Sequence, residues 1–343
     1  GAHPALHSFP TRRSSDRVAV LPNIVLLFAS ISILEDSGYM ARASFLMDRL
    51  MQRVGLHGRS FIPLLVGFGC TVPAILATRT LESRRDRLTT MLVLPLMSCG
   101  ARLPIYTLLI PAFFPEPARA PVLWLLYLVG IGLAVIGAMA LRRTIFRGES
   151  EPLVMELPPY RAPTVRSVLT HMAERGWQYL RKAGTVILAI SVVLWALTTF
   201  PRLPETATAG LAGEDARAAE MAHSAAGRLG HFLEPALRPM GFDWRAGTAM
   251  IGAFAAKEVF VAQLGIVFAV GDAGENVESL RMRLRKAYTP LQGLCMMLFM
   301  LIGTPCMATV AVTRRESGSW GWALAQFGRS EEHTSELQSR QSI

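Results

Sequence analysis

Two of the four cysteines interrupt apolar sequence in similar surroundings. Cys70 lies in the run GFGCTVP at residues 67–73, and Cys306 lies in the run GTPCMAT at residues 303–309. Each run is followed by a basic patch that continues into Glu-Ser. A thiolate is a soft donor that suits first-row transition metals, and a bound metal keeps it deprotonated. The pair indicates a site for a soft divalent metal ion, with close helix packing through small residues as the alternative.

The residues around the two cysteines interrupt helical hydrogen bonding, and this frees backbone carbonyls as further ligands. Helices broken at membrane depth are tolerated where they line a cavity, and a corresponding pair of them marks the binding site of a transporter. Threonine hydroxyls add oxygen donors. The residues expected to shape this pathway are Gly67, Gly69, Thr71, Pro73, Gly303, Thr304, Pro305 and Thr309.

Three further candidate metal ligands and one candidate gating residue lie at apolar segments. Cys99 and Arg102 share a third break that contains Gly and Pro. Because an arginine within a membrane should face a polar interior and repel a cation, Arg102 is expected to steady carbonyls or a carboxylate, in a structural or gating role. Glu35 and Glu258 are acids at or inside apolar segments, with a wet helix end as the alternative for Glu35. Lys257 cannot share a helix face with its neighbour Glu258.

The elements that must position these residues are long apolar segments. The chain has 343 residues, of which 51% are hydrophobic and 17% charged, and its mean hydropathy is +0.35. A membrane span needs about 20 mainly apolar residues. The segments that meet this length are 18–34, 88–114, 121–141, 183–200, 247–270 and 291–312. The sequence therefore predicts an all-α, polytopic integral membrane helical bundle.

The net charge of +10 follows from where the basic residues stand. They cluster at the ends of apolar segments, at 142–147, 175–182 and 281–286, as the positive-inside rule predicts for cytoplasmic loops. No aromatic residues interleave with them as a stacking platform requires, so nucleic acid is not an expected partner. The chain contains no phosphate-binding loop, no H-E-x-x-H and no G-x-S-x-G. Neither catalytic residues nor enzyme activity are therefore predicted.

The Pro-rich stretch 148–176 is expected to be a cytoplasmic linker between two halves. Before it we expect a first module at 18–78 and a central transmembrane region at 79–147, and after it a second module at 177–327. The ends, 1–17 and 328–343, resemble translated sequencing-adapter DNA and are set aside as non-native. Both modules are then truncated, and the chain is expected to be a fragment.

Five motifs carry a resemblance to a known family. They are EDSGYMAR at 35–42, GFGCTVP at 67–73, MSCGARLP at 97–104, MELP at 155–158 and KEV at 257–259. Together they resemble the membrane region of the bacterial ferrous iron transport protein B family, over roughly residues 18–327. The resemblance implies two nucleoside-transporter-like Gate modules with broken helices around a central helical region.

The same resemblance implies transport of Fe²⁺ across the bacterial inner membrane. Fe²⁺ is then the cargo and not a cofactor, and GTP and Mg²⁺ belong only to an N-terminal GTP-binding domain that is missing here. The implied partners are the lipid bilayer, Fe²⁺, that GTP-binding domain and small Feo accessory proteins, and a homo-oligomer is left open.

Three functions remain open from the sequence. They are metal transport, transport of a nucleoside or another small solute, and a membrane scaffold inactive in transport. A nucleoside site would need Asn, Gln and stacking aromatics, whereas the breaks offer thiols and threonines. Thiolate affinity rises from Fe²⁺ towards Cu²⁺, so the residues indicate a soft divalent metal and only the resemblance indicates iron.

Overall fold

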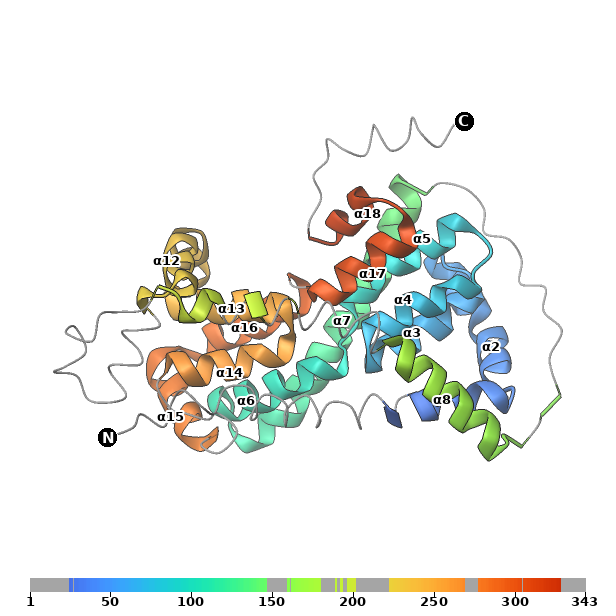
Figure 1. Ribbon diagram of the computed structural model, residues 1–343, viewed down its shortest axis with the longest axis horizontal. Helices are drawn as coiled ribbons and strands as arrows, with labels where there is room; N and C mark the ends of the chain where they lie inside the picture. The colour runs from blue at the N-terminus through green and yellow to red at the C-terminus, as the bar shows by residue number, and fades with distance from the viewer. Residues whose placement is uncertain are drawn as a thin grey trace.

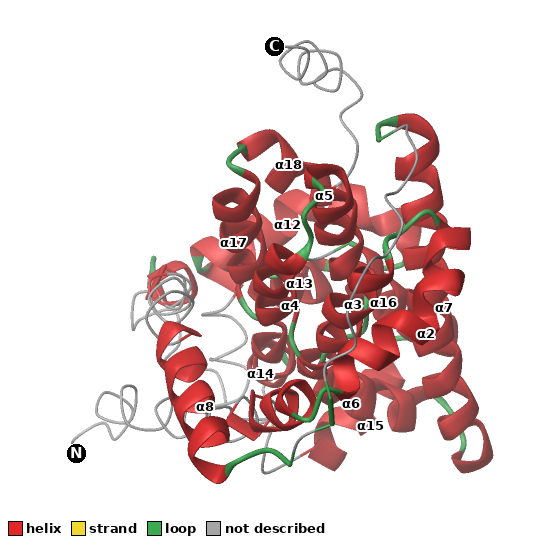
Figure 2. Ribbon diagram, turned by 90° about the vertical axis from the view of Figure 1, so that its right-hand side faces the viewer, coloured by secondary structure: helices red, strands yellow, loops and turns green. Residues whose placement is uncertain are grey.

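The computed structural model describes residues 25–26, 28–146, 159–160, 162–179, 189, 192–193, 196–201, 222–268, 277–303 and 305–327. In this part of the chain all regular structure is helical and no strand occurs, which confirms the all-α prediction (Figure 2). The expected non-native ends, the first part of the linker and the pathway residue Thr304 lie outside the described residues.

The helices before the linker include the longest one, and several are short and interrupted. They are α2 (Tyr39–Val54), η1 (Gly58–Ser60), α3 (Phe61–Gly69), α4 (Thr71–Ala77), η2 (Thr78–Thr80), α5 (Arg84–Val93), η3 (Leu94–Leu96), η4 (Gly100–Arg102), α6 (Leu103–Phe113) and α7 (Glu116–Thr144). The second part of the expected linker is itself helical, as α8 (Val165–Tyr179).

Several of the helices after the linker are likewise short and interrupted. They are α12 (Ala225–Leu237), η6 (Arg238–Met240), α13 (Trp244–Ala255), α14 (Lys257–Val267), α15 (Val277–Ala287), α16 (Pro290–Ile302), α17 (Met307–Ser317), α18 (Trp320–Leu324) and η7 (Ala325–Phe327).

These helices form two groups, and each group contains helices from both halves of the chain (Figure 1). On one side α6 packs with α14, α15 and α16, although it comes from the first half of the chain. On the other side α17 packs on α4 and is followed by α18. Two apolar cores agree with this division: Phe260 and Met296 share a core with Leu109, whereas Ala308 shares one with Ile75. Helix α7 runs between the groups.

Each group contains a pair of short helices broken at one extended residue. Cys70 separates α3 from α4 with φ −150° and ψ 131°, and Ala256 separates α13 from α14 with φ −152° and ψ 133°. The members of each pair pack on each other. A Cβ on Gly252 of α13 would lie 2.8 Å from the Gln263 side chain of α14, so the second pair is a hairpin in which the chain folds back.

Two further breaks lie where the chain crosses from one group to the other. Cys99, between η3 and η4, has φ −78° and ψ 160°, and Cys306, between α16 and α17, has φ −73° and ψ 150°. Because both lie where the chain crosses between the groups, Cys306 corresponds to Cys99, whereas Cys70 and Ala256 each separate two helices within one group. The pairing of Cys70 with Cys306 that their similar runs suggest is wrong.

Three helical stretches are long and apolar enough to cross a membrane by length and composition, within the described residues. They are Arg84–Phe113, Glu116–Thr144 and Pro290–Ser317, which contain the predicted spans 88–114, 121–141 and 291–312 apart from residue 114. The predicted span 247–270 is instead the hairpin α13–α14, because its helix ends at Ala255. Of the predicted spans 18–34 and 183–200, only residues 25–26, 28–34, 189, 192–193 and 196–200 are among the described residues.

Helix α7 passes the crossing breaks at its midpoint. Its 29 residues correspond to about 44 Å at 1.5 Å per residue, more than the roughly 30 Å of hydrocarbon in a bilayer. Gly130 is the central residue, and a Cβ there would lie 3.1 Å from the Leu96 carbonyl oxygen and 3.6 Å from Ser98 Oγ. The same Cβ would lie 3.3 Å from the Leu301 side chain of α16. Both crossing segments therefore meet α7 near its centre.

Candidate metal path

The structure brings Cys70 and Cys306 into one apolar cluster. Both thiols are half-buried and pack against the core formed by α3, α4, α5 and α17. Cys306 Sγ lies 2.9 Å from Thr309 Oγ1, so this predicted pathway threonine contacts the predicted ligand directly. Thr309 is itself buried. Residues 236 positions apart are thus neighbours because α17 crosses to the first group of helices.

Cys99 joins the same neighbourhood. The Cys70 thiol lies within electrostatic interaction range of Cys99, Cys306 and Glu258. No group of three His, Cys, Asp or Glu side chains within the described residues is close enough together to hold a metal ion. The cysteines therefore surround a common region without forming a finished tetrahedral or octahedral ligand set.

Glycines allow the breaks to approach each other. A Cβ on Gly100 would lie 3.2 Å from the Gly69 carbonyl oxygen, so the Cys70 break and the Cys99 break meet backbone to backbone. A Cβ on Gly67 would lie 3.0 Å from Leu94 Cδ2. Thr71 and Pro73 are buried in the first turn of α4. Gly67 and Gly69 therefore lie at the contact between α3 and the first crossing segment.

The second crossing break is organised by Gly303 and Pro305. Gly303 is the C-cap of α16 and Pro305 is buried just before Cys306. A proline cannot donate a backbone hydrogen bond, so the helix cannot continue through this position. The carbonyls of the last turn of α16 are then available to other donors.

Arg102 donates to two of those carbonyls and to two carbonyls of the first crossing segment. Its side chain is 1% exposed, and its guanidinium donates to the carbonyls of Pro95 (2.8 Å), Met97, Met300 (3.2 Å) and Leu301 (2.7 Å). These carbonyls belong to both crossing segments, at η3 and at the end of α16. Arg102 therefore steadies carbonyls, one of the two roles expected for it, and fastens the two breaks together.

Lys257 is a functional candidate that the sequence reasoning did not select. Its side chain is 4% exposed, and Nζ donates to the Met300 carbonyl at 3.1 Å. It lies within electrostatic interaction range of Arg102, Cys99 and Cys306. A lysine in an apolar segment is itself a signal of function, and that signal was present in the sequence.

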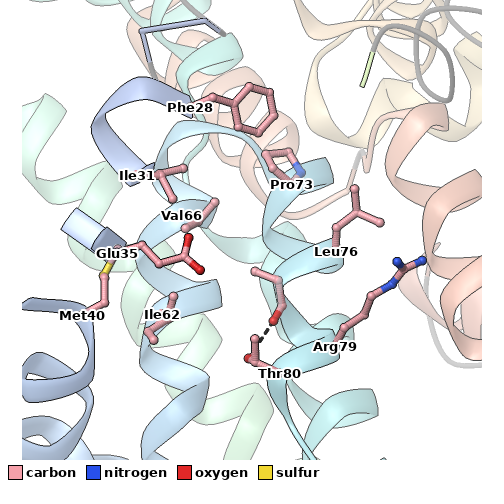
Figure 3. A pocket seen from close by; sticks show the side chains of 11 residues that line it. Phe28, Ile31, Glu35, Met40, Ile62, Val66, Pro73, Leu76, Arg79 and Thr80 are labelled. Atoms are coloured by element: carbon pink, nitrogen blue, oxygen red, sulfur yellow. Dashed lines mark hydrogen bonds between the residues drawn. The ribbon is translucent and has the colours of Figure 1, made fainter. Parts of the chain in front are cut away.

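The two candidate glutamates occupy different places. Glu258 is exposed in the first turn of α14 whereas Lys257 is buried, so the two neighbours do not share a helix face, as predicted. Glu35 lines a mainly apolar cavity of about 290 Å³ between the first helical segment and the α3–α4 hairpin (Figure 3). Pro73 also lines this cavity, whereas Cys70 does not.

A charged cluster closes the ends of the two cysteine-bearing segments. Arg79, after α4, makes a bidentate ion pair with Glu316 of α17 at 2.8 and 2.5 Å. Arg87 of α5 binds the same carboxylate at 2.5 Å. The Glu316 side chain is only 3% exposed. The basic patches noted after both runs are therefore in direct contact.

Comparison with known proteins agrees with these features. The family model described as "nucleoside recognition" (Gate) matches residues 18–113 and 180–320, and the one described as "ferrous iron transport protein B C terminus" matches residues 123–175. The first Gate match continues past Cys99, and thus includes both the hairpin α3–α4 and the first crossing segment. The unit boundaries expected from the sequence remain predictions.

Three curated relatives indicate the same family relationship. A fusion of Fe(2+) transport protein A with the Fe(2+) transporter FeoB from Porphyromonas gingivalis is 46% identical, over 90% of this chain and 40% of that protein. The Fe(2+) transporters FeoB of Leptospira biflexa and Campylobacter jejuni are each 41% identical over 90% of this chain, covering 46% and 50% of those proteins. The chain thus spans about half the length of these relatives or less. No solved structure matches it.

Paired helical hairpins and broken crossing helices define a multi-pass membrane protein of the Gate type. The chain belongs to the ferrous iron transport protein B (FeoB) family and represents its membrane region, with two Gate segments and the FeoB C-terminal segment. The GTP-binding domain is not among the matched segments.

Proposed function

We propose that this chain is the permease region of a transporter that moves Fe²⁺ across the bacterial inner membrane, with energy or gating supplied by a GTP-binding domain. The observation that carries the proposal is the convergence of Cys70, Cys99 and Cys306 at breaks from both halves of the chain. The names of the relatives supply the identity of the ion, because a thiol site by itself would favour later first-row metals.

The breaks supply a route through which an ion can be handed on. Each break frees backbone carbonyls from the helical hydrogen-bond pattern, and Thr309 adds a hydroxyl beside Cys306. Metal binding to thiols releases protons, which makes binding reversible and dependent on pH. We propose Cys70 and Cys306 as the principal ligands, Cys99 and Glu258 as further ligands and Glu35 as an acid of the lateral cavity. Gly67, Gly69, Thr71, Pro73, Gly303, Thr304 and Pro305 shape the route in this proposal.

The partners follow from the same assignment. We propose that GTP and Mg²⁺ bind only to the GTP-binding domain and that this chain holds no cofactor of its own. A small accessory protein is a further proposed partner, because the Porphyromonas gingivalis relative carries an Fe(2+) transport protein A in the same polypeptide. Self-association in the lipid bilayer belongs to the proposal as well.

The test is anaerobic Fe²⁺ binding to the purified chain in detergent. We expect saturable binding in the wild type and loss of it in the double variant Cys70→Ser/Cys306→Ser. Cys295→Ser is the matched control, because Cys295 is a half-buried free thiol that packs in the other apolar core, on α16. Equal binding in the double variant and the wild type would remove the metal role of these cysteines.

A nucleoside is the competing cargo, because the matching Gate model carries the description "nucleoside recognition". Comparison of the wild type with the Cys70→Ser/Cys306→Ser variant also distinguishes a nucleoside from Fe²⁺ as the cargo. A nucleoside carrier should bind a labelled nucleoside, and removal of two sulfur atoms should leave that binding unchanged. Binding of a nucleoside with no thiol-dependent Fe²⁺ binding would replace the iron proposal.

A further inference from the structure

Two basic side chains occupy the broken end of α16. Arg102 Nε and Lys257 Nζ both donate to the Met300 carbonyl, at 3.2 and 3.1 Å. The C-terminal end of a helix carries partial negative charge, and transporters use such ends and unwound carbonyls to coordinate cations. The position that would suit a cation at this break is therefore filled by the protein's own side chains.

The two side chains are held to different degrees. Arg102 donates to four carbonyls from a rigid, planar group with five N–H donors. Lys257 has three N–H donors on a flexible stem, and Met300 is its one hydrogen-bond acceptor within the described residues. Four hydrogen bonds anchor Arg102, whereas Lys257 breaks only one hydrogen bond when it leaves this position.

Lys257 forms no ion pair with a carboxylate in the described part of the chain. A buried charge is costly unless a partner compensates it. Cys99 and Cys306 lie within electrostatic interaction range of the ammonium, and a metal ion would bind them as thiolates. A metal ion held by these thiols would compete with the ammonium for the same negative charge.

We propose that Lys257 is a tethered cation: its ammonium occupies the cation position at the α16 break in the metal-free protein, and a divalent metal ion must displace it to bind beside Cys99 and Cys306. This inference rests on the proposed function. Lys257 begins α14 directly after the extended residue Ala256. Rotation about the side-chain bonds of Lys257 turns the ammonium away without unwinding either helix. The corresponding position in the first half is Thr71, so only one hairpin carries such a cation.

The first test compares Co²⁺ affinity among purified variants in detergent, followed by the near-ultraviolet absorption of cobalt thiolates. Lys257→Met removes a like charge from the site, so we expect it to bind Co²⁺ about tenfold more tightly than the wild type, or better. Lys257→Arg keeps the charge and should not bind more tightly. Lys286→Met is the matched control, because Lys286 is an exposed lysine at the end of α15, and it should equal the wild type.

The second test needs no variant and therefore does not depend on whether Lys257→Met folds. An amine-reactive reagent is applied to the wild type with and without Co²⁺, and each lysine is quantified by peptide mass spectrometry. Displacement should raise the labelling of Lys257 several-fold while that of Lys286 stays constant. If saturating Co²⁺ leaves the extent of Lys257 labelling unchanged, the proposal is overturned.

The outcomes separate this inference from the proposed function. Thiol-dependent metal binding in the wild type, with the same affinity in Lys257→Met, keeps the proposed function and refutes the tethered cation. Binding that emerges only in Lys257→Met supports the tethered cation. Absence of thiol-dependent binding in the wild type and in Lys257→Met refutes both.

Discussion

Arg79 and Glu316 are 237 positions apart and form a bidentate ion pair, which ties the exit of α4 to the exit of α17. The Glu316 carboxylate also binds Arg87 and is almost fully buried. The two cysteine-bearing segments are therefore fastened to each other at one end, beyond the thiols. A path between them cannot widen at this end unless the cluster opens.

The first prediction concerns the strength of that fastening. A double-mutant cycle with Arg79→Gln and Glu316→Gln should give a coupling free energy of about 1–3 kcal/mol, because the carboxylate is desolvated and the pair is bidentate. Thermal unfolding in detergent measures it. The pair Arg59–Glu82 is the control, since Glu82 is 77% exposed and the expected coupling is at most about 1 kcal/mol. Similar couplings for both pairs would show that the Glu316 cluster is not a fastening.

The second prediction concerns the two buried cations. Arg102→Met removes hydrogen bonds to four carbonyls, of which only Met300 keeps another side-chain donor among the described residues, and should lower the free energy of unfolding by more than about 3 kcal/mol. Lys257→Met removes one hydrogen bond, and the Met300 carbonyl keeps Arg102 as a donor, so this substitution should cost clearly less. Thermal unfolding of both variants under identical conditions gives the comparison. Equal losses would mean that Arg102 does not hold the two crossing segments together.

The third prediction uses two glycines in different surroundings. A Cβ on Gly293 of α16 would lie 2.3 Å from the Phe113 ring of α6, so Gly293→Ala should destabilise the protein by about 1–3 kcal/mol. A Cβ on Gly132 of α7 would meet nothing within 4 Å. Gly132→Ala should therefore be neutral or stabilise by up to about 1 kcal/mol through helix propensity. Opposite shifts in melting temperature are expected, and a harmless Gly293→Ala would contradict the close packing of α6 on α16.

The fourth prediction is a pH dependence at the start of α16. Burial and the hydrogen bond to the Asp243 carboxylate raise the pKa of the Tyr288 hydroxyl well above its usual range. The folded state then favours the neutral phenol, so its contribution is complete below about pH 10, the pKa of an unfolded tyrosine, and is lost as the pH rises above that value. Tyr288→Phe should be less stable at pH 7 and should lose less stability between pH 9 and 11. Parallel melting curves for the two proteins across that interval would exclude this role.

Much of the fold could be predicted from Gly, Pro and the length of apolar runs. The breaks at Cys70, Cys99 and Cys306 were all predicted, because Gly and Pro stand beside each of them. The break at Ala256 was not, since the residues around it are good helix formers. Tertiary packing of α13 on α14 overrides that propensity, and this packing cannot be predicted from a local stretch of sequence.

The correspondence between the breaks could not be predicted either. Similar letters around Cys70 and Cys306 suggested equivalent positions, yet the fold pairs Cys70 with Ala256 and Cys99 with Cys306. Equivalent positions depend on where each segment lies in the fold, and the exchange of α6 and α17 between the groups is a property of the whole chain. The metal roles of the predicted ligands remain predictions.

The position of the breaks along α7 also determines how strongly the membrane potential acts on a cation bound there. Gly130 is the centre of α7 and meets both crossing segments, so a membrane centred on this helix places the breaks near half depth. Moving one elementary charge across the full membrane potential is worth about 2.3 kcal/mol per 100 mV. A divalent ion that reaches half depth from the positive side gains about the same amount, roughly a fifty-fold change in occupancy. The affinity of a cation site at these breaks would therefore depend on the membrane voltage.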